Sequence, residues 1–503
     1  MAVQILEKLK RLRLRLIDGY LNVPDNQTMS ISITFYGAAQ GVTGSRHVLD
    51  VDGTKVLFDC GMFQGRRSES HERNSAFPID PTTIHNMVLT HAHIDHSGAL
   101  PILIREGFEG NIYCTRATAD LAKIMLRDSG NIQERDAEHM NKKKRRHARK
   151  EGKKGPKELV KPIYTVADAE ACDSFFFPVS YHQEFDVAPG IKVQLTDQGH
   201  IIGSASAHVT ITRPGKDPVR IVFSGDLGRP DMPILKDPEP YPPCEYVLTE
   251  STYGNRLHEP IGDMESQLAE AVREVHRRGG RLIIPAFSVG RTQNIIYFLQ
   301  SIFDRGDVKP ITTYVDSPLS RRATHVYFDH PECFDEETLA FLKKEDSNRM
   351  SNFHYVESVD ESKSLNDLPN PLIIISSSGM CEAGRILHHL KRTVEDPKNV
   401  ICIVGYMAEH TLGRRIVDKA KDIRIFGQNY ELNAGILTMN GFSAHADQAG
   451  IVHSISHLKD TLKKVILIHG EETQSIPLKA KLHEEGHANV EIAELFSTMV
   501  LEE

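Results

Sequence analysis

The chain has 503 residues, of which 40% are hydrophobic and 25% are charged, and its net charge is −8. This length suffices for two or three domains with separate cores, and the composition is that of an ordinary globular protein. No apolar run approaches the ~20 residues of a membrane helix, and the negative charge excludes a globally basic nucleic-acid binder.

The beginning of the chain and the cysteines bear on the cellular setting. VQILEKLKRLRLRLI (3–17) interleaves leucines with basic residues and has no apolar stretch of signal-peptide length. Its periodicity leaves both an amphipathic helix and an edge strand open. The seven cysteines form no C-x-x-C pair, which indicates reduced thiols and a cytoplasmic location.

From residue 31 the sequence predicts alternating strands and helices. ISITF (31–35) is strand-like, and RHVLDVDGTKVLFDCG (46–61) predicts a hairpin that turns at Asp52-Gly53. NMVLT (86–90) is a short strand that leads into a histidine-rich stretch. The further expected elements are helices at 99–107 and 117–130, the latter ended by Gly130, and strands at 192–196, 208–213 and 220–225.

A second texture begins at Tyr253, where helices alternate with fully apolar strands such as RLIIPAF (281–287) and PLIIIS (371–376). Continuous apolar strands joined by helices predict a parallel sheet covered on both faces. The last eighty residues return to the first texture, so we expect a discontinuous first domain with an α/β insertion. The expected divisions are an amphipathic extension at 1–29, the first domain at 30–252 and 424–503, and the insertion at 253–423.

One segment is strongly basic. Residues 142–157, KKKRRHARKEGKKGPK, contain ten Lys or Arg against one Glu, within an expected basic insertion at 140–160. A solvated, mobile loop and a nucleic-acid contact are both open interpretations.

The histidine-rich stretch THAHIDHSG (90–98) contains His91, His93, Asp95 and His96. Their spacing of two is typical of a strand or loop that folds around an ion, and it differs from ligands on one helix face. Imidazole and carboxylate ligands suit zinc, with manganese as the alternative. Without a metal, four such groups packed together would be left unsatisfied.

The H-x-H-x-D-H stretch followed by Ser-Gly resembles the signature of the metallo-β-lactamase fold, an αββα sandwich. The resemblance implies that residues at the ends of three other strands also belong to the metal site. Asp59 in KVLFDCG would orient ligands without binding metal, His200 in LTDQGHIIGSAS would be a ligand, and Asp226 in IVFSGDLGRPD would bridge two metals.

Three further motifs resemble motifs A, B and C of the β-CASP branch, whose members cleave nucleic acids. They are VLTESTYGN with Glu250, GFSAHAD with His445 and VILIHGEE with His469. The resemblance spans about residues 31–495. It is closest to the RNA-processing group that includes the 3′-end cleavage endonuclease subunit of polyadenylation and its prokaryotic relatives. The long C-terminal extension usual in ribonuclease J has no counterpart, which weighs against a 5′-exonuclease.

The resemblance therefore implies a zinc-dependent ribonuclease with two zinc ions, acting on single-stranded RNA that enters between the domains. An endonuclease is favoured. The alternatives are an exonuclease, a hydrolase of another ester and a catalytically idle RNA-binding subunit. A homodimer is left open. His445 would be the general acid, oriented by Glu250. The implied ligands are His91, His93 and His200 for one metal, Asp95, His96 and His469 for the other, and Asp226 between them.

Two strand-to-helix junctions in the insertion can bind phosphate through backbone N–H groups, although ordinary capping explains them as well. They are SSSGM (376–380) with Arg385, and PAFSVGRTQ (285–293). The resemblance favours an RNA-backbone role. The predicted substrate-binding residues are Ser376, Ser377, Ser378, Gly379, Arg385 and Arg291.

Overall fold

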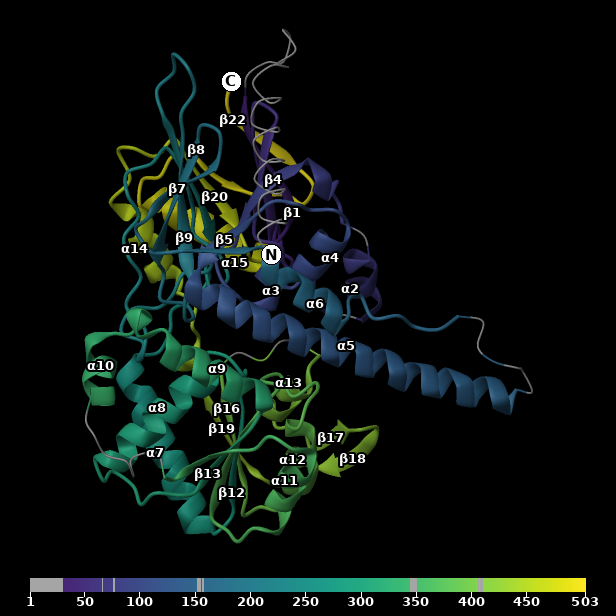
Figure 1. The fold of residues 1–503 in the computed structure, drawn as a ribbon. Coiled ribbons are helices and arrows are strands. Elements are labelled where there is room, and N and C mark those ends of the chain that lie inside the picture. Colours follow the sequence, from purple (N-terminus) through teal and green to yellow (C-terminus); the bar gives the residue numbers. More distant parts are fainter. Residues whose placement is uncertain are drawn as a thin grey trace.

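The computed structural model describes residues 30–503 apart from 66, 76, 152–154, 156–157, 344–350, 406 and 408–409. The expected extension at 1–29 lies outside this range. Two packed sheets form one part of the molecule and a third sheet forms the other, with a long helix running between them (Figure 1). None of the described helices combines the length and apolar character needed to cross a membrane.

The first sheet has seven strands in the order β22-β1-β2-β3-β4-β5-β6. The hairpin expected at Asp52-Gly53 is confirmed: Val51 pairs with Thr54, and both turn residues have positive φ, +52° and +88°. The strands are β1 Ile31–Gly37, β2 Arg46–Val51, β3 Thr54–Phe58, β4 Ile84–Val88, β5 Ile112–Thr115, β6 Phe176–Val179 and β22 Thr498–Glu502.

The second sheet also has seven strands, in the order β21-β20-β11-β10-β9-β8-β7. Its strands β10, β11, β20 and β21 run parallel to one another. The bounds are β7 Glu184–Ala188, β8 Ile191–Asp197, β9 Ala205–Ile211, β10 Val219–Phe223, β11 Tyr246–Glu250, β20 Lys464–Ile468 and β21 Val490–Ile492.

These two sheets pack face to face around a shared apolar core, in which Phe58 stacks on Phe223 with ring centroids 3.7 Å apart. A second core lies between the first sheet and its helices, and a third between the second sheet and its helices, which confirms the αββα sandwich. The helices of this part are α2 Arg67–Asn74, α3 Ile94–Ser97, α4 Leu100–Arg105, α5 Arg116–Lys150, α6 Val166–Ala171, α14 Gln448–Ser456 and α15 Glu472–Glu484.

The third sheet is entirely parallel, with the strand order β14-β13-β15-β12-β16-β19. Apolar cores lie on both of its faces, as the continuous apolar strands predict. Its strands are β12 Arg281–Pro285, β13 Thr313–Asp316, β14 Phe353–Tyr355, β15 Leu372–Ser376, β16 Val400–Val404 and β19 Gly435–Met439.

The helices and the small hairpin of this part complete the described elements. The helices are α7 Ile261–Arg278, α8 Arg291–Asp304, α9 Pro318–Asp329, α10 Glu336–Lys343, α11 Val359–Ser364, α12 Ile386–Thr393 and α13 Leu412–Val417. The hairpin pairs β17 Asp422–Ile425 with β18 Gln428–Glu431. Short 3₁₀ helices lie at Pro81–Thr83, Cys172–Ser174, Pro331–Cys333, Leu365–Asp367 and Asn440–Phe442.

Helix α5 corrects two expectations. It continues through Gly130, where we expected it to end, up to Lys150. A Cβ at Gly130 would stand 3.0 Å from the backbone of Thr165, so this glycine permits close packing and is not a helix cap. The described basic residues 142–150 are therefore helical, and the mobile-loop interpretation is wrong for them.

The return to the sandwich also comes later than expected. Strand β19, which we expected within the second part of the first domain, pairs in parallel with β16 over five residues, from Val400 opposite Gly435 to Val404 opposite Met439. Composition does not tell which of two sheets an apolar strand joins. The chain thus leaves the six-stranded sheet after Met439 and not at residue 424.

Candidate metal centre

The predicted site residues meet at one edge of the sandwich. Asp59, His91, His200 and Asp226 follow the carboxyl ends of β3, β4, β8 and β10, Glu250 ends β11, and His469 follows β20. Since β3 is parallel to β4, and β10 to β11 and β20, these strand ends lie at a common edge. The fold therefore brings together residues as far apart in the sequence as Asp59 and His469.

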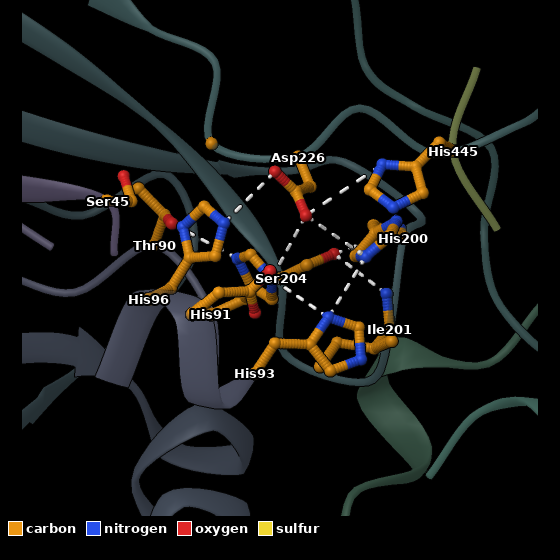
Figure 2. Close-up of polar contacts among 12 residues, drawn as sticks. Ser45, Thr90, His91, His93, His96, His200, Ile201, Ser204, Asp226 and His445 are labelled. Carbon is orange, nitrogen blue, oxygen red and sulfur yellow. Dashed lines mark hydrogen bonds and ion pairs between the residues drawn. The ribbon is translucent and has the colours of Figure 1, made fainter. Parts of the chain in front are cut away.

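His91, His93, His200 and Asp226 form the first ligand group (Figure 2). His93 Nδ1 lies 3.1 Å from His91 Nε2 and 3.2 Å from His200 Nε2. Asp226 Oδ2 lies 3.4 Å from His91 Nε2 and 3.5 Å from His200 Nε2. Four ligands at ~2.0–2.1 Å from a tetrahedral zinc ion are ~3.3 Å apart, so these distances fit one ion.

Asp95, His96 and His469 form the second group. The two imidazole Nε2 atoms are 3.1 Å apart, and Asp95 Oδ2 lies 3.7 Å from His469 Nε2. The other oxygen of Asp226, Oδ1, is 3.2 Å from His96 Nε2. This buried oxygen accepts no hydrogen bond from the described residues. The Asp226 carboxylate thus presents one oxygen to each group, as a bridging ligand does.

The electrostatics of the cluster suit metal binding. Burial lowers the pKa of His91, His93 and His200, that of His93 to about 3, so these imidazoles are neutral with free lone pairs. Burial opposes ionisation of Asp226, but the surrounding imidazoles, His469 first, hold its pKa well below the usual range. Burial disfavours a charge on His96 as well, yet Asp226 and Asp59 raise its pKa well above the ordinary value. A proton on His96 therefore competes with a metal ion.

Outer hydrogen bonds fix the ring orientations. Asp59 Oδ2 accepts from His96 Nδ1 at 2.7 Å, which turns Nε2 toward the second group, and Asp59 Oδ1 accepts from the Thr90 amide at 2.8 Å. Thr90 Oγ1 lies 3.2 Å from His91 Nδ1, and Thr252 Oγ1 lies 3.1 Å from His469 Nδ1. We did not predict the two threonines. Thr90 precedes the histidine motif directly and Thr252 follows Glu250 closely, and this adjacency is the only sequence signal they offer.

The loop that carries Asp59 approaches the histidine motif through a glycine. The amide of Cys60 donates to the carbonyl of His96 at 2.7 Å. A Cβ at Gly61 would overlap the carbonyl of Asp95, so only glycine allows this contact.

His445 lies beside both ligand groups and is held by Glu250. Its Nδ1 is 3.0 Å from Glu250 Oε2 and 3.8 Å from Asp226 Oδ2. Glu250 is fully buried and also accepts from the Leu227 amide at 2.6 Å. Burial alone would lower the pKa of His445, but Glu250 and then Asp226 outweigh it and raise the pKa to about 9. The His445 side chain is 21% exposed, so the protonated ring faces the solvent side of the site.

Arg291 lies at the start of α8, close to this site. Its Nη1 donates to the carbonyl of Val404, and burial lowers its pKa to about 10, opposed by the hydroxyl of Tyr253. The Tyr253 ring lies 6.0 Å from that of His445. Within the described part of the chain no carboxylate pairs with Arg291, so its charge is available to a phosphate.

The other predicted substrate-binding residues make hydrogen bonds or ion pairs with neighbouring protein groups. Arg385 Nη1 pairs with buried Asp316 at 2.6 Å, and Ser376 Oγ donates to the carbonyl of the same residue at 3.0 Å. Ser378 Oγ accepts from the amide of Glu382 at 3.3 Å, as a capping side chain does. Ser377 Oγ donates to Ser317 Oγ at 3.4 Å. These contacts hold the strand ends together.

Phe287 is an aromatic residue near the site that we did not predict. It is 46% exposed, and three atoms of its ring lie 3.0–3.2 Å from where a Cβ of Gly379 would stand. Three residues later, Gly290 approaches Ile201, the neighbour of His200. Phe287 thus lies in a loop that touches the metal-site loop, with Gly379 behind its ring. Phe287 stands at the end of an apolar stretch of sequence, and nothing in that stretch indicates that its ring is exposed.

Comparisons with protein families match the chain in three consecutive parts. Residues 44–263 match the metallo-beta-lactamase superfamily, residues 292–416 the Beta-Casp domain, and residues 429–493 the Zn-dependent metallo-hydrolase RNA specificity domain. Together the three matches cover most of the chain.

Among the proteins that resemble the chain over most of its length are a ribonuclease and a transcription termination factor. Ribonuclease TTHA0252 of Thermus thermophilus is 35% identical over 447 residues, covering 88% of this chain and 94% of that protein. Transcription termination factor FttA of Methanocaldococcus jannaschii is 31% identical, covering 89% of this chain and 68% of that protein.

Among solved structures, a protein of unknown function from Enterococcus faecalis V583 matches 94% of this chain and all of that one. Its TM-score is 0.52 at 13% sequence identity, which indicates a shared fold.

Proposed function

The chain belongs to the β-CASP family of the metallo-β-lactamase superfamily, and on that premise we propose that it is a two-zinc ribonuclease that cuts RNA internally. Membership makes it a metal-dependent hydrolase of RNA. The observation that carries the proposal is the pair of ligand groups joined by Asp226, with His445 held by Glu250 beside them. The relatives named as a ribonuclease and as a transcription termination factor support RNA as the substrate.

The residues present fit two zinc ions. His91, His93 and His200 would hold one ion, and Asp95, His96 and His469 the other, with Asp226 shared. The mixture of imidazole nitrogens and carboxylate oxygens suits zinc better than magnesium or calcium. When bound, the two ions supply Lewis-acid stabilisation and a nucleophile at neutral pH.

His445 would donate the proton to the leaving 3′ oxygen. Its Nδ1 hydrogen is held by Glu250, which leaves Nε2 free to carry the transferred proton. The two carboxylates beside the ring keep that proton in place until an oxyanion develops nearby. Asp59 contributes indirectly, since it fixes the orientation of His96.

Single-stranded RNA would be gripped by side chains of two kinds. Arg291 would pair with a backbone phosphate, because its charge has no carboxylate partner within the described residues. Phe287 would stack on a base, since a supported and half-exposed ring offers a π-face to any base. Both lie in the loop that connects β12 to α8 or directly after it.

The test is reconstitution of the chelated protein with zinc. We expect no RNA hydrolysis without metal and full activity at two equivalents of zinc per chain. The variant Asp226→Asn should lose the second equivalent and the activity. The matched control is His457→Ala, which should behave as wild type; His457 directly follows α14 and bonds to the Tyr241 carbonyl. Hydrolysis by metal-free protein, or saturation below two equivalents, would contradict the proposal.

A further inference from the structure

Helix α5 connects the metal site to a distant basic end. It has 35 residues and is therefore ~50 Å long at 1.5 Å per residue. Its first half runs between the sandwich and the six-stranded sheet, and its second half extends away from both (Figure 1). The far end is thus a separate surface of the molecule.

The near end of α5 is anchored at the metal-site loop. Thr115, the N-cap, and Thr118 both donate their hydroxyl hydrogens to the carbonyl of Gly203, at 2.7 Å each. Gly203 is three residues from His200. On the other side, Asp128 of α5 pairs with Arg322 of α9 at 2.8 Å. The start of the helix therefore has a fixed position relative to the site.

A strap of chain at residues 158–165 is hydrogen-bonded to the far half of the helix. The side chain of Asn141 accepts from the amide of Val160 at 2.8 Å and donates to its carbonyl at 2.9 Å. Gln133 Oε1 accepts from the amide of Ile163 at 3.1 Å. These contacts cover one side of the helix and leave the others in solvent.

The positive charge is concentrated in the last nine residues of α5, whereas Asp136 and Glu138 are exposed earlier in the same half and His147 pairs with Glu151 just beyond the helix. Residues 142–150 carry seven basic side chains and no acidic one, all exposed: Lys142, Lys143, Lys144, Arg145, Arg146, Arg149 and Lys150. Across the described residues, no carboxylate lies within ion-pair distance of any of the seven. The helix dipole favours cations only in the last turn, whereas like charges four residues apart, such as Lys142 and Arg146, destabilise a helix. Repulsion among these charges therefore destabilises this end of the helix, and a bound polyanion would remove that repulsion.

We propose that the basic end of α5 binds the phosphate backbone of the substrate RNA far from the cut. The inference rests on the proposed function, because it takes the polyanion to be the RNA already held at the metal site. Lys142 and Lys150 lie ~40–50 Å along the helix from its anchored end. At ~3.4 Å per nucleotide of a stacked strand, ~12–15 nucleotides span that distance. A stacked strand shorter than this does not reach both places.

The first test neutralises Lys142, Lys143, Arg145 and Arg146 together to glutamine, leaving the last turn intact. Each lost phosphate contact lowers the slope of log affinity against log salt by ~0.7, so we expect a slope ~2–3 smaller on an RNA of ~40 nucleotides. On an RNA of ~4 nucleotides, too short to span the distance even when unstacked, affinity and hydrolysis should equal those of wild type. The matched control neutralises four other exposed basic residues and should leave the salt dependence unchanged on both RNAs. They are Lys391, Arg392, Lys398 and Lys421.

The outcomes separate this inference from the proposed function. An unchanged slope on the long RNA overturns the role of α5, while normal cleavage of the short RNA keeps the ribonuclease proposal. Wild-type protein that cleaves neither RNA contradicts the proposed function, and a variant that loses the short RNA while wild type cleaves it overturns the separate role of α5. Binding of an acidic protein, or of a second copy of this chain, in place of the RNA would also overturn the inference.

The second test maps where the RNA lies. All seven native cysteines are buried, so a cysteine placed by His147→Cys on the exposed end of α5 would take a photocrosslinker alone. In RNA bound to an Asp95→Ala variant, we expect crosslinks ~12–15 nucleotides from the site that the wild-type enzyme cuts. Crosslinks spread evenly along the RNA, or none, would overturn the inference.

Discussion

Glu250 gives the clearest way to test the role of His445. Replacing Glu250 by Gln keeps the size of a fully buried side chain and its oxygen for the Leu227 amide, but removes the negative charge beside His445. The prediction is that His445 loses its proton at lower pH in the variant. A general acid must be protonated, so the activity should then fall at a lower pH.

The size of the effect follows from the contacts of His445. Raising its pKa from 6.5 to about 9 corresponds to ~3.4 kcal/mol of preference for the protonated ring. Glu250, at 3.0 Å, contributes more than Asp226, at 3.8 Å, and bound cations offset the charge of Asp226. If Glu250 supplies about half of this preference, its loss costs ~1.5–2 kcal/mol and lowers the pKa of His445 by ~1–1.5.

The assay is the pH dependence of kcat/KM, which reports ionisations of the free enzyme. The alkaline limb of the Glu250→Gln profile should move down by ~1–1.5, with a ~10–30-fold loss of rate at high pH and little loss at low pH. A substrate with sulfur in place of the 3′-bridging oxygen needs no proton on its leaving group, so the alkaline difference should vanish. A loss that is equal at every pH, or that accompanies loss of zinc, would refute the reasoning.

Three further predictions concern other residues of the site. His445→Ala should lower turnover by ~10²–10⁴-fold with zinc content unchanged, and the 3′-sulfur substrate should restore much of the rate; loss of zinc would mark His445 as a ligand. Asp59→Ala should weaken zinc binding by ~10–100-fold in a competition titration, because His96 loses the partner that orients it, and unchanged affinity would contradict that role. Phe287→Ala should raise KM by ~5–100-fold with kcat nearly constant, whereas Phe426→Ala, an equally exposed ring at the β17–β18 turn, should leave both unchanged.

The parts of the fold that could be predicted are those with a strong local signal. The Asp52-Gly53 turn requires positive φ, and the apolar runs 281–285 and 372–376 have the composition of strands buried on both faces. The histidine motif also indicates its chemistry locally. Asp59, His200 and Asp226, in contrast, were placed by resemblance, since nothing within a single strand shows which distant strand end it will meet.

The errors arose where a tertiary contact decides the local structure. Gly130 has the sequence appearance of a helix end, and only the approach of Thr165 shows why glycine stands inside a continuing helix. The strand at 435–439 is equally apolar in either sheet, and its pairing with β16 settles its place. Arg385 stays a predicted phosphate ligand, and the sequence did not show that its guanidinium pairs with Asp316, 69 residues earlier in the chain.

The most direct test of the central claim uses a covalently closed circular RNA, which has no ends. Wild-type protein with two zinc ions should open the circle, and a linear RNA of unit length should accumulate before shorter products. The Asp95→Ala variant, which lacks a proposed ligand, should leave the circle intact. An untouched circle in the presence of wild-type protein that degrades the linear form of the same RNA would contradict internal cleavage at this site.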